Sequence, residues 1–423
     1  MRRFRGLIGV AMLGLLLSAC ATSSSGPGYR APPAQSLLYP KTEIEEARLL
    51  DVWIELFDPG KLDSKEAEKT GVSETIRKAE SRFIPVHLKD TIQATGYWGA
   101  VRVVPRGSIG AEVLVSGKIL KSDGRTLALR ITARDALGET WFERDYSRKV
   151  SPEDYRNTVR GEQDAFQDVY NRIANDLAAM AQQLFAAGVR NIRDAAALRF
   201  AADIAPQPYA DYLSKSQDGR VEIARLPARD DPLYERVLRL KERDEMLVDT
   251  LNIRYGQFYD DMWDTYVNWR KTRLDEALAL ERVKRQATNK KILGAAAILG
   301  AIAIDVLGGR KTRSHTGALQ GVMIAGGAMA VKAGIEQGAE ADIHKSAIQE
   351  LGQSFDAEVA PMVVDVDGQT IELTGSADVQ YQRWRELLHR RYAVETGAPI
   401  APPSDADRPA PVSLGADTSG ASR

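Results

Sequence analysis

The sequence predicts an α+β protein: a small mixed-sheet domain with helices on one face, followed by a long helical region with a glycine-rich helical hairpin and a C-terminal β-hairpin. Three observations support this class. Short apolar runs separated by turn residues alternate with one helical pattern between residues 45 and 187. Helical periodicity then extends over 233–291, and two apolar segments rich in Gly and Ala follow it.

Composition limits the possible functions. The chain has 423 residues, more than one hydrophobic core usually organises, and its 44% hydrophobic and 27% charged residues are typical of folded protein. A formal net charge of -1 provides no basic surface for nucleic acid, so we expect no nucleic-acid partner. The single cysteine, and four histidines without ligand spacing, lead us to expect no metal and no cofactor.

The N-terminus has the features of an export signal. Arg2, Arg3 and Arg5 precede an apolar run over 7–17 that is too short to span a bilayer, and Leu17-Ser18-Ala19-Cys20 follows. This sequence resembles the lipobox of bacterial lipoproteins. The resemblance implies that residues 1–19 are a signal peptide, that Cys20 carries palmitate and other acyl chains, and that these chains bind the membrane. Ala21 stands where an Asp would retain such a protein in the inner membrane, so we expect the periplasmic face of the outer membrane.

The segment 20–44 is rich in Ser, Gly and Pro, which predicts a flexible tether. The domain over 45–187 should then begin with a central strand at 51–57 and a helix at 73–95, which Pro85 should kink or divide. Strands should follow at 100–104, 111–120, 125–133 and 139–146, with turns at 121–124 and 135–138. A helix with an apolar stripe should start at Ser151 and end at Gly188.

Two stretches of this domain carry a second resemblance, Gly96-Tyr97-Trp98-Gly99-Ala100-Val101-Arg102-Val103 and Val115-Ser116-Gly117-Lys118-Ile119-Leu120. They resemble the domain of envelope lipoproteins related to the curli secretion channel and to the activator of a penicillin-binding protein. The resemblance covers about residues 45–185. Its motifs are structural, and it brings no catalytic residues with it.

After a connector at 188–232, we expect one long helix or coiled coil over 233–291. An aromatic stripe there is typical of core, although it could also form a carbohydrate platform or a partner groove. The stripe comprises Tyr255, Phe258, Tyr259, Met262, Trp263, Tyr266 and Trp269. Asp260, Asp261 and Asp264 alternate with it, as on a solvated helix face, and they are also the chain's candidate carboxylate cluster for acid/base catalysis or a divalent ion.

The apolar segments Ile292–Leu307 and Ala318–Ala333 predict a glycine-rich hairpin over 292–338. Small residues recur every fourth position at Gly326, Ala330, Gly334 and Gly338, which predicts a close helix–helix contact. We favour a soluble or interfacial pair over a membrane-spanning one, because each segment is short and contains a charged residue. Over 339–396 we expect a helix, a β-hairpin and a closing helix, and over 397–423 a disordered tail.

No G-x-S-x-G, H-E-x-x-H or nucleotide-binding glycine loop occurs in the sequence, so we expect a protein that is not an enzyme. The hypothesis we favour is a lipid-anchored periplasmic adaptor or assembly factor of the cell envelope. It would bind a periplasmic or outer-membrane protein partner and could form a homo-oligomer. One alternative is an oligomeric pore-forming or secretion component that uses the glycine-rich hairpin. A further alternative is a motif-poor envelope glycan enzyme using Asp260, Asp261 and Asp264.

Overall fold

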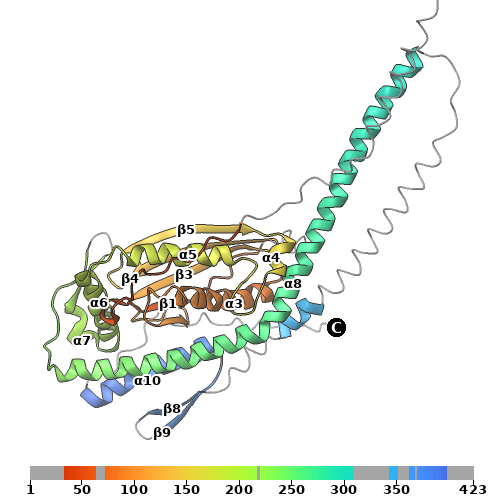
Figure 1. Ribbon diagram of the computed structural model, residues 1–423. Coiled ribbons are helices and arrows are strands. Elements are labelled where there is room, and N and C mark those ends of the chain that lie inside the picture. The colour runs from red at the N-terminus through yellow and green to blue at the C-terminus, as the bar shows by residue number, and fades with distance from the viewer. Residues whose placement is uncertain are drawn as a thin grey trace, which may run out of the picture.

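The computed structural model describes residues 33–62, 72–216, 220–307, 343–350, 362–366 and 369–397 (Figure 1). Cys20, the small-residue repeat from Gly326 to Gly338, and the expected tail after Gly397 lie outside these residues. Within them the predicted α+β class is confirmed: a mixed five-stranded sheet packs against helices, and a long helical region follows it in the chain.

The five-stranded sheet has the order β2-β1-β3-β4-β5. Its strands are β1 (Val52–Glu55), β2 (Val101–Val104), β3 (Val113–Ser122), β4 (Thr126–Asp135) and β5 (Thr140–Lys149). Strand β1 is parallel to both β2 and β3, whereas β3, β4 and β5 form an antiparallel meander. Each of these strands was expected from its apolar run. The meander turns contain Gly124 and Gly138 at φ of 77° and 81°, a region that glycine enters without strain.

Helix α3 (Glu74–Gln93) begins at Ser73, whose side chain accepts a hydrogen bond from the Ile76 N–H. The prediction that Pro85 divides this helix was wrong, since α3 continues through it. Proline at position 85 cannot donate to the Ser81 carbonyl one turn earlier. The Phe57 N–H, just after β1, donates to that carbonyl instead at 2.9 Å. The Ser81 carbonyl that proline leaves free is thus satisfied by another segment of the same chain.

The helix expected over 151–188 is two helices. Helix α4 (Pro152–Arg156) and helix α5 (Gln167–Ala181) are separated by a loop in which Gly161 has a φ of 77°. The Asp164 carboxylate accepts the Phe166 N–H just before α5, which satisfies a backbone donor at the helix start. Gly188 does not end this region, because it lies in the first turn of the next helix, α6 (Ala186–Ile204).

The expected connector 188–232 is largely structured. It contains α6, α7 (Pro206–Tyr209), a short 3-10 helix η2 (Ala210–Tyr212) and a small sheet of β6 (Leu213–Lys215) and β7 (Val221–Ile223). Helix α6 joins two hydrophobic clusters: Val189 and Ile192 pack in the first, Phe200 and Ile204 in the second. A helix buried on several sides has no single apolar stripe. The sequence of α6 therefore lacks the helical periodicity from which a helix would have been predicted.

Helix α8 runs without interruption from Pro232 to Leu307, 76 residues or about 114 Å. Its first half covers the open edge of β2, where the Asn252 side chain accepts the Val103 N–H at 3.1 Å. Glu281 still pairs with Arg125 at the sheet, and beyond it Figure 1 shows α8 leaving the other elements. The first expected hairpin arm, Ile292–Leu307, is therefore a continuation of α8, and its partner arm lies outside the described residues.

The predicted C-terminal elements are present. Strands β8 (Met362–Val366) and β9 (Gln369–Leu373) form an antiparallel pair, and α10 (Ala377–Thr396) packs on α8. Residues 343–350 are helical, as expected. Among the helices of the described residues, none combines the length and the apolar character that crossing a membrane requires.

One face of the sheet is covered by α3 and α5. Along β4, Leu127, Leu129 and Ile131 are buried in the first hydrophobic cluster, whereas Arg130 on the opposite face is exposed. Gly117 of β3 lies against the Phe57 ring, where an added Cβ would approach a ring carbon to 2.4 Å. This close approach explains the glycine in the Val115-Ser116-Gly117 strand, because no larger residue fits beneath that ring.

Candidate functional site

The aromatic stripe of α8 lies in the core. All seven of its members are buried, and Tyr259 and Trp263 pack on Phe83 of α3 with ring centroids 4.5 and 5.9 Å apart. The interpretation as core is therefore confirmed, and the carbohydrate platform and the partner groove are contradicted. The Tyr259 hydroxyl also forms a 2.7 Å hydrogen bond with Nδ1 of His87, so the stripe joins α8 to α3 by polar contacts as well.

A buried ion pair lies beside this stripe. The Arg270 guanidinium donates to both oxygens of Asp164 at 2.5 and 3.1 Å, and it lies 4.4 Å from the centroid of the Tyr266 ring. Burial alone would raise the pKa of Asp164, but the Arg270 charge together with the hydrogen bonds from Arg270 and the Phe166 N–H lowers it. Both side chains are enclosed, so this pair holds α8 to the loop before α5 and offers no surface to a ligand.

The three candidate catalytic acids lie elsewhere. Asp260, Asp261 and Asp264 are exposed, and Asp264 pairs with Arg160 at 2.6 Å. They line none of the three hollows described below. Within the part of the chain that the structure describes, no group of three or more His, Cys, Asp or Glu side chains is arranged to hold a metal ion. The solvated-face interpretation of the three acids fits these positions.

The largest of the three hollows, about 710 Å³, opens where the end of the expected tether meets the α5–α6 junction. We call it the tether hollow. It is lined by residues 38–45, Arg48, Leu50, Tyr97, Trp98, Ala181, Gln182, Leu184 and Val189. A second hollow, of about 580 Å³, lies near α4 and includes Pro33 and Asp154. A third, of about 660 Å³, lies between α6 and β7 and shares Leu184 with the tether hollow.

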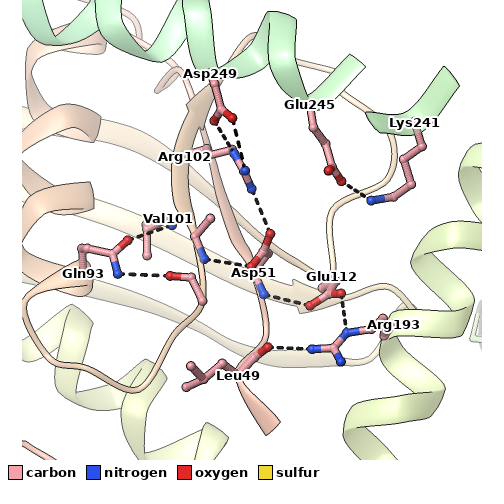
Figure 2. Close-up of polar contacts among 12 residues, drawn as sticks. Leu49, Asp51, Gln93, Val101, Arg102, Glu112, Arg193, Lys241, Glu245 and Asp249 are labelled. Atoms are coloured by element: carbon pink, nitrogen blue, oxygen red, sulfur yellow. Dashed lines mark hydrogen bonds and ion pairs between the residues drawn. The ribbon is translucent and has the colours of Figure 1, made fainter. Parts of the chain in front are cut away.

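A polar cluster fixes the segment just before β1 (Figure 2). Leu50 of this segment lines the tether hollow. Arg193 of α6 donates to the Leu49 carbonyl at 2.7 Å and to Glu112 at 3.0 Å. Glu112 in turn accepts the Asp51 N–H at 2.8 Å. Two positions just before β1, Leu49 and Asp51, are thus held to α6 and to the residue before β3, so this side of the hollow has a fixed backbone.

The same cluster reaches α8 (Figure 2). Arg102 of β2 lies between two carboxylates, Asp51 at 2.8 Å and Asp249 of α8 at 2.6 Å. Burial opposes ionisation of Arg102, yet the charges and hydrogen bonds of Asp249 and Asp51 together raise the Arg102 pKa. Burial raises the pKa of Glu112, which the Asp51 N–H and Arg193 only partly offset. These groups pair with one another, so the cluster has a structural role: it holds the chain before β1 to β2, α6 and α8.

Inside the tether hollow, Trp98 has an unused hydrogen-bond donor. Its side chain is 3% exposed and stacks on Trp141 at 6.1 Å, and its indole N–H meets no acceptor among the described residues. The neighbouring Tyr97 hydroxyl accepts a hydrogen bond from Gln182 at 2.9 Å. An indole N–H that is buried without a partner costs free energy, but this nitrogen is itself enclosed, so the hollow is offered the ring of Trp98 and not its donor.

The surface around the hollow exposes large apolar side chains. Phe185, at the α5–α6 junction, is 84% exposed, and Tyr39 is 62% exposed. In the sequence Tyr97 and Trp98 belong to a structural strand pattern, and neither Phe185 nor Tyr39 stands out. The one signal for this site was the pair of adjacent aromatics after Gly96, which do not alternate as strand residues on one face would.

Comparisons with family models, with curated proteins and with solved structures found no match to this chain. The fold and the site together define an α+β protein with a sheet covered on one face, a long edge-covering helix and an open, partly apolar hollow. The resemblance to bacterial envelope lipoproteins stays a prediction from the sequence.

Proposed function

We propose that this protein is a lipid-anchored adaptor or assembly factor on the periplasmic face of the outer membrane, and that it binds a protein partner at the tether hollow. The observation that carries the proposal is the pair of exposed aromatic side chains at the tether hollow, Phe185 beside it and Tyr39 in its lining. Exposed aromatic side chains are typical of protein-binding surfaces, where aromatic residues are enriched.

The position of residues 33–44, which end the expected tether, supports this proposal. Pro33 lines the hollow near α4, and the Gln35 N–H bonds to Asp168 at the start of α5. The tether hollow includes Ala181 and Leu184 at the other end of α5. The 15-residue helix separates the two places by about 22 Å, and the chain follows it to the tether hollow, which residues 38–45 line, so the tether itself forms part of the docking surface.

The experiment is site-specific photocrosslinking in cells, with a photoreactive phenylalanine analogue at position 185. Position 253 is the matched control, because Ile253 of α8 is also an exposed apolar residue, at 64%. We expect one adduct of defined mass from position 185, identified by mass spectrometry, and none of that mass from position 253. The substitution Tyr39→Ala, which removes the exposed aromatic ring from the lining of the hollow, should weaken this adduct.

Two results would reject the adaptor. Equal adducts from both positions would show that Phe185 is an ordinary surface residue. Adducts formed only between copies of this chain, in a ring-sized complex after detergent extraction, would favour the pore-forming or secretion alternative instead.

A further inference from the structure

An extended segment, residues 33–40, lies along α5, and we call it the strap. It falls within the expected flexible tether 20–44, yet its backbone is fixed by α5 side chains. Asp168 accepts the Gln35 N–H at 2.9 Å, and Asn171 donates to the Gln35 carbonyl at 2.6 Å. Asn175 donates to the Ser36 carbonyl at 2.9 Å and accepts the Leu38 N–H at 2.7 Å.

The α5 residues form a site for an extended backbone. Asp168, Asn171 and Asn175 are three and four positions apart, so they share one face of the helix. Asn171 is 8% exposed and Asn175 is 5% exposed, and each needs hydrogen-bond partners because it is buried. Asn175 contacts both an N–H and a carbonyl of the strap, as a neighbouring β-strand would, and these bonds are to backbone rather than side-chain atoms.

The strap itself contributes little apolar burial. Its residues Pro33, Gln35, Ser36, Leu38 and Tyr39 are exposed. Leu37 is the strap residue that packs, partly buried, against the first hydrophobic cluster. Attachment therefore depends mainly on four hydrogen bonds to α5, whose donors and acceptors could bond to water after release.

The strap also forms part of the tether hollow, because Leu38, Tyr39 and Pro40 line it. Fixed contacts begin again after the strap: Ile44 packs against the first cluster, and Arg193 holds the Leu49 carbonyl. Release would therefore free the chain as far as about residue 44 and leave the start of β1 in place.

We propose that α5 is a binding site for an extended peptide backbone, that the strap is its resident and detachable occupant, and that release both lengthens the tether and opens the tether hollow. With the strap bound, residues 20–32 connect Cys20 to the body and span at most about 45 Å. With it released, residues 20–44 span about 85 Å. The two tether lengths rest on the proposed lipid anchor, whereas the binding of the strap to α5 does not.

The first measurement is amide hydrogen exchange of the strap in the full mature chain. The N–H groups of Gln35 and Leu38 should be protected in the wild type. Asn171→Ala with Asn175→Ala should raise their exchange rates at least tenfold. Because buried changes on α5 could disturb the helix, Leu38→Pro provides an independent variant that leaves α5 unchanged and removes the N–H that Asn175 accepts. Leu38→Ala is its matched control and should keep the Gln35 protection of the wild type.

The second measurement tests the tether length. The mature lipidated chain is placed in vesicles, and energy transfer is measured between a labelled lipid and a dye at an exposed β5 position, Glu143→Cys. Leu38→Pro should lower the transfer efficiency relative to Leu38→Ala, and it should change the crosslinking yield at position 185.

Each result decides part of the proposal. Strap amides that exchange at unprotected rates in the wild type, or that stay protected in both disrupting variants, would overturn it. Unchanged energy transfer despite lost protection would reject the change in tether length. A failure of the adaptor function appears separately, as absent lipid at Cys20 or absent adducts at position 185, with strap protection unaffected.

Discussion

The ion pair between Asp164 and Arg270 gives the sharpest test of how α8 is held to the sheet domain. Asp164→Asn keeps the shape of the side chain but removes its charge, and it leaves the Arg270 guanidinium in the core without a counter-ion. The two side chains are 0% and 1% exposed, so water cannot replace the lost partner. Breaking a pair this deeply buried costs about 3–5 kcal/mol of unfolding free energy.

A second ion pair between the same loop and α8 provides the control. Arg160 and Asp264 are joined at 2.6 Å, but their side chains are 46% and 76% exposed. Asp264→Asn should therefore cost at most about 1 kcal/mol. Removing both buried charges, with Asp164→Leu and Arg270→Met, should recover a large part of the loss, because no uncompensated charge remains.

The assay is urea unfolding of the unlipidated mature chain at pH 7.5, monitored by circular dichroism. The slope of unfolding free energy against urea concentration is compared between the wild type and each variant. The pKa of Asp164 is lowered in the fold, so its contribution is present above the unfolded-state pKa and is lost as the pH falls through the folded-state pKa. A cost for Asp164→Asn below about 1 kcal/mol, or equal to that of Asp264→Asn, would refute the reasoning from burial.

Three further predictions follow from single positions. Gly124→Ala should lower the melting temperature much more than Gly161→Ala: both glycines have a φ of 77°, but only at Gly124 would the new Cβ meet a carbonyl, that of Arg270, at 2.4 Å. Burial raises the pKa of Asp244 from 3.8 to about 6, so its stabilising contribution is present at low pH and is lost as the pH rises through 6. Asp244→Asn should thus gain stability relative to wild type between pH 4 and pH 7.5, by on the order of 3 kcal/mol in urea unfolding, and no change with pH would contradict this. Cys20→Ser should leave an unprocessed precursor that takes up no labelled palmitate, and normal labelling would end the lipoprotein interpretation.

Local patterns in the sequence determined much of the fold. Alternation along Leu127, Leu129 and Ile131 predicted β4, and the turn residues around Gly124 and Gly138 predicted where the meander reverses. The aromatic stripe of α8 was interpreted as core from its spacing alone. These features depend on residues close together in the chain, so their periodicity and turn chemistry are sufficient to place them.

Other features depend on contacts between distant residues, and only the tertiary structure decided them. Helix α3 continues past Pro85 because Phe57 uses the free carbonyl of Ser81. The strap looks like a flexible tether by composition, and it is ordered because Asn171 and Asn175 bind its backbone. The candidate site combines the strap, the turn with Trp98 and the α5–α6 junction. No local sequence pattern indicates that these three segments lie close together. Hydrogen bonds and burial between remote segments carry no periodicity in the sequence, so they become visible only when the chain is folded.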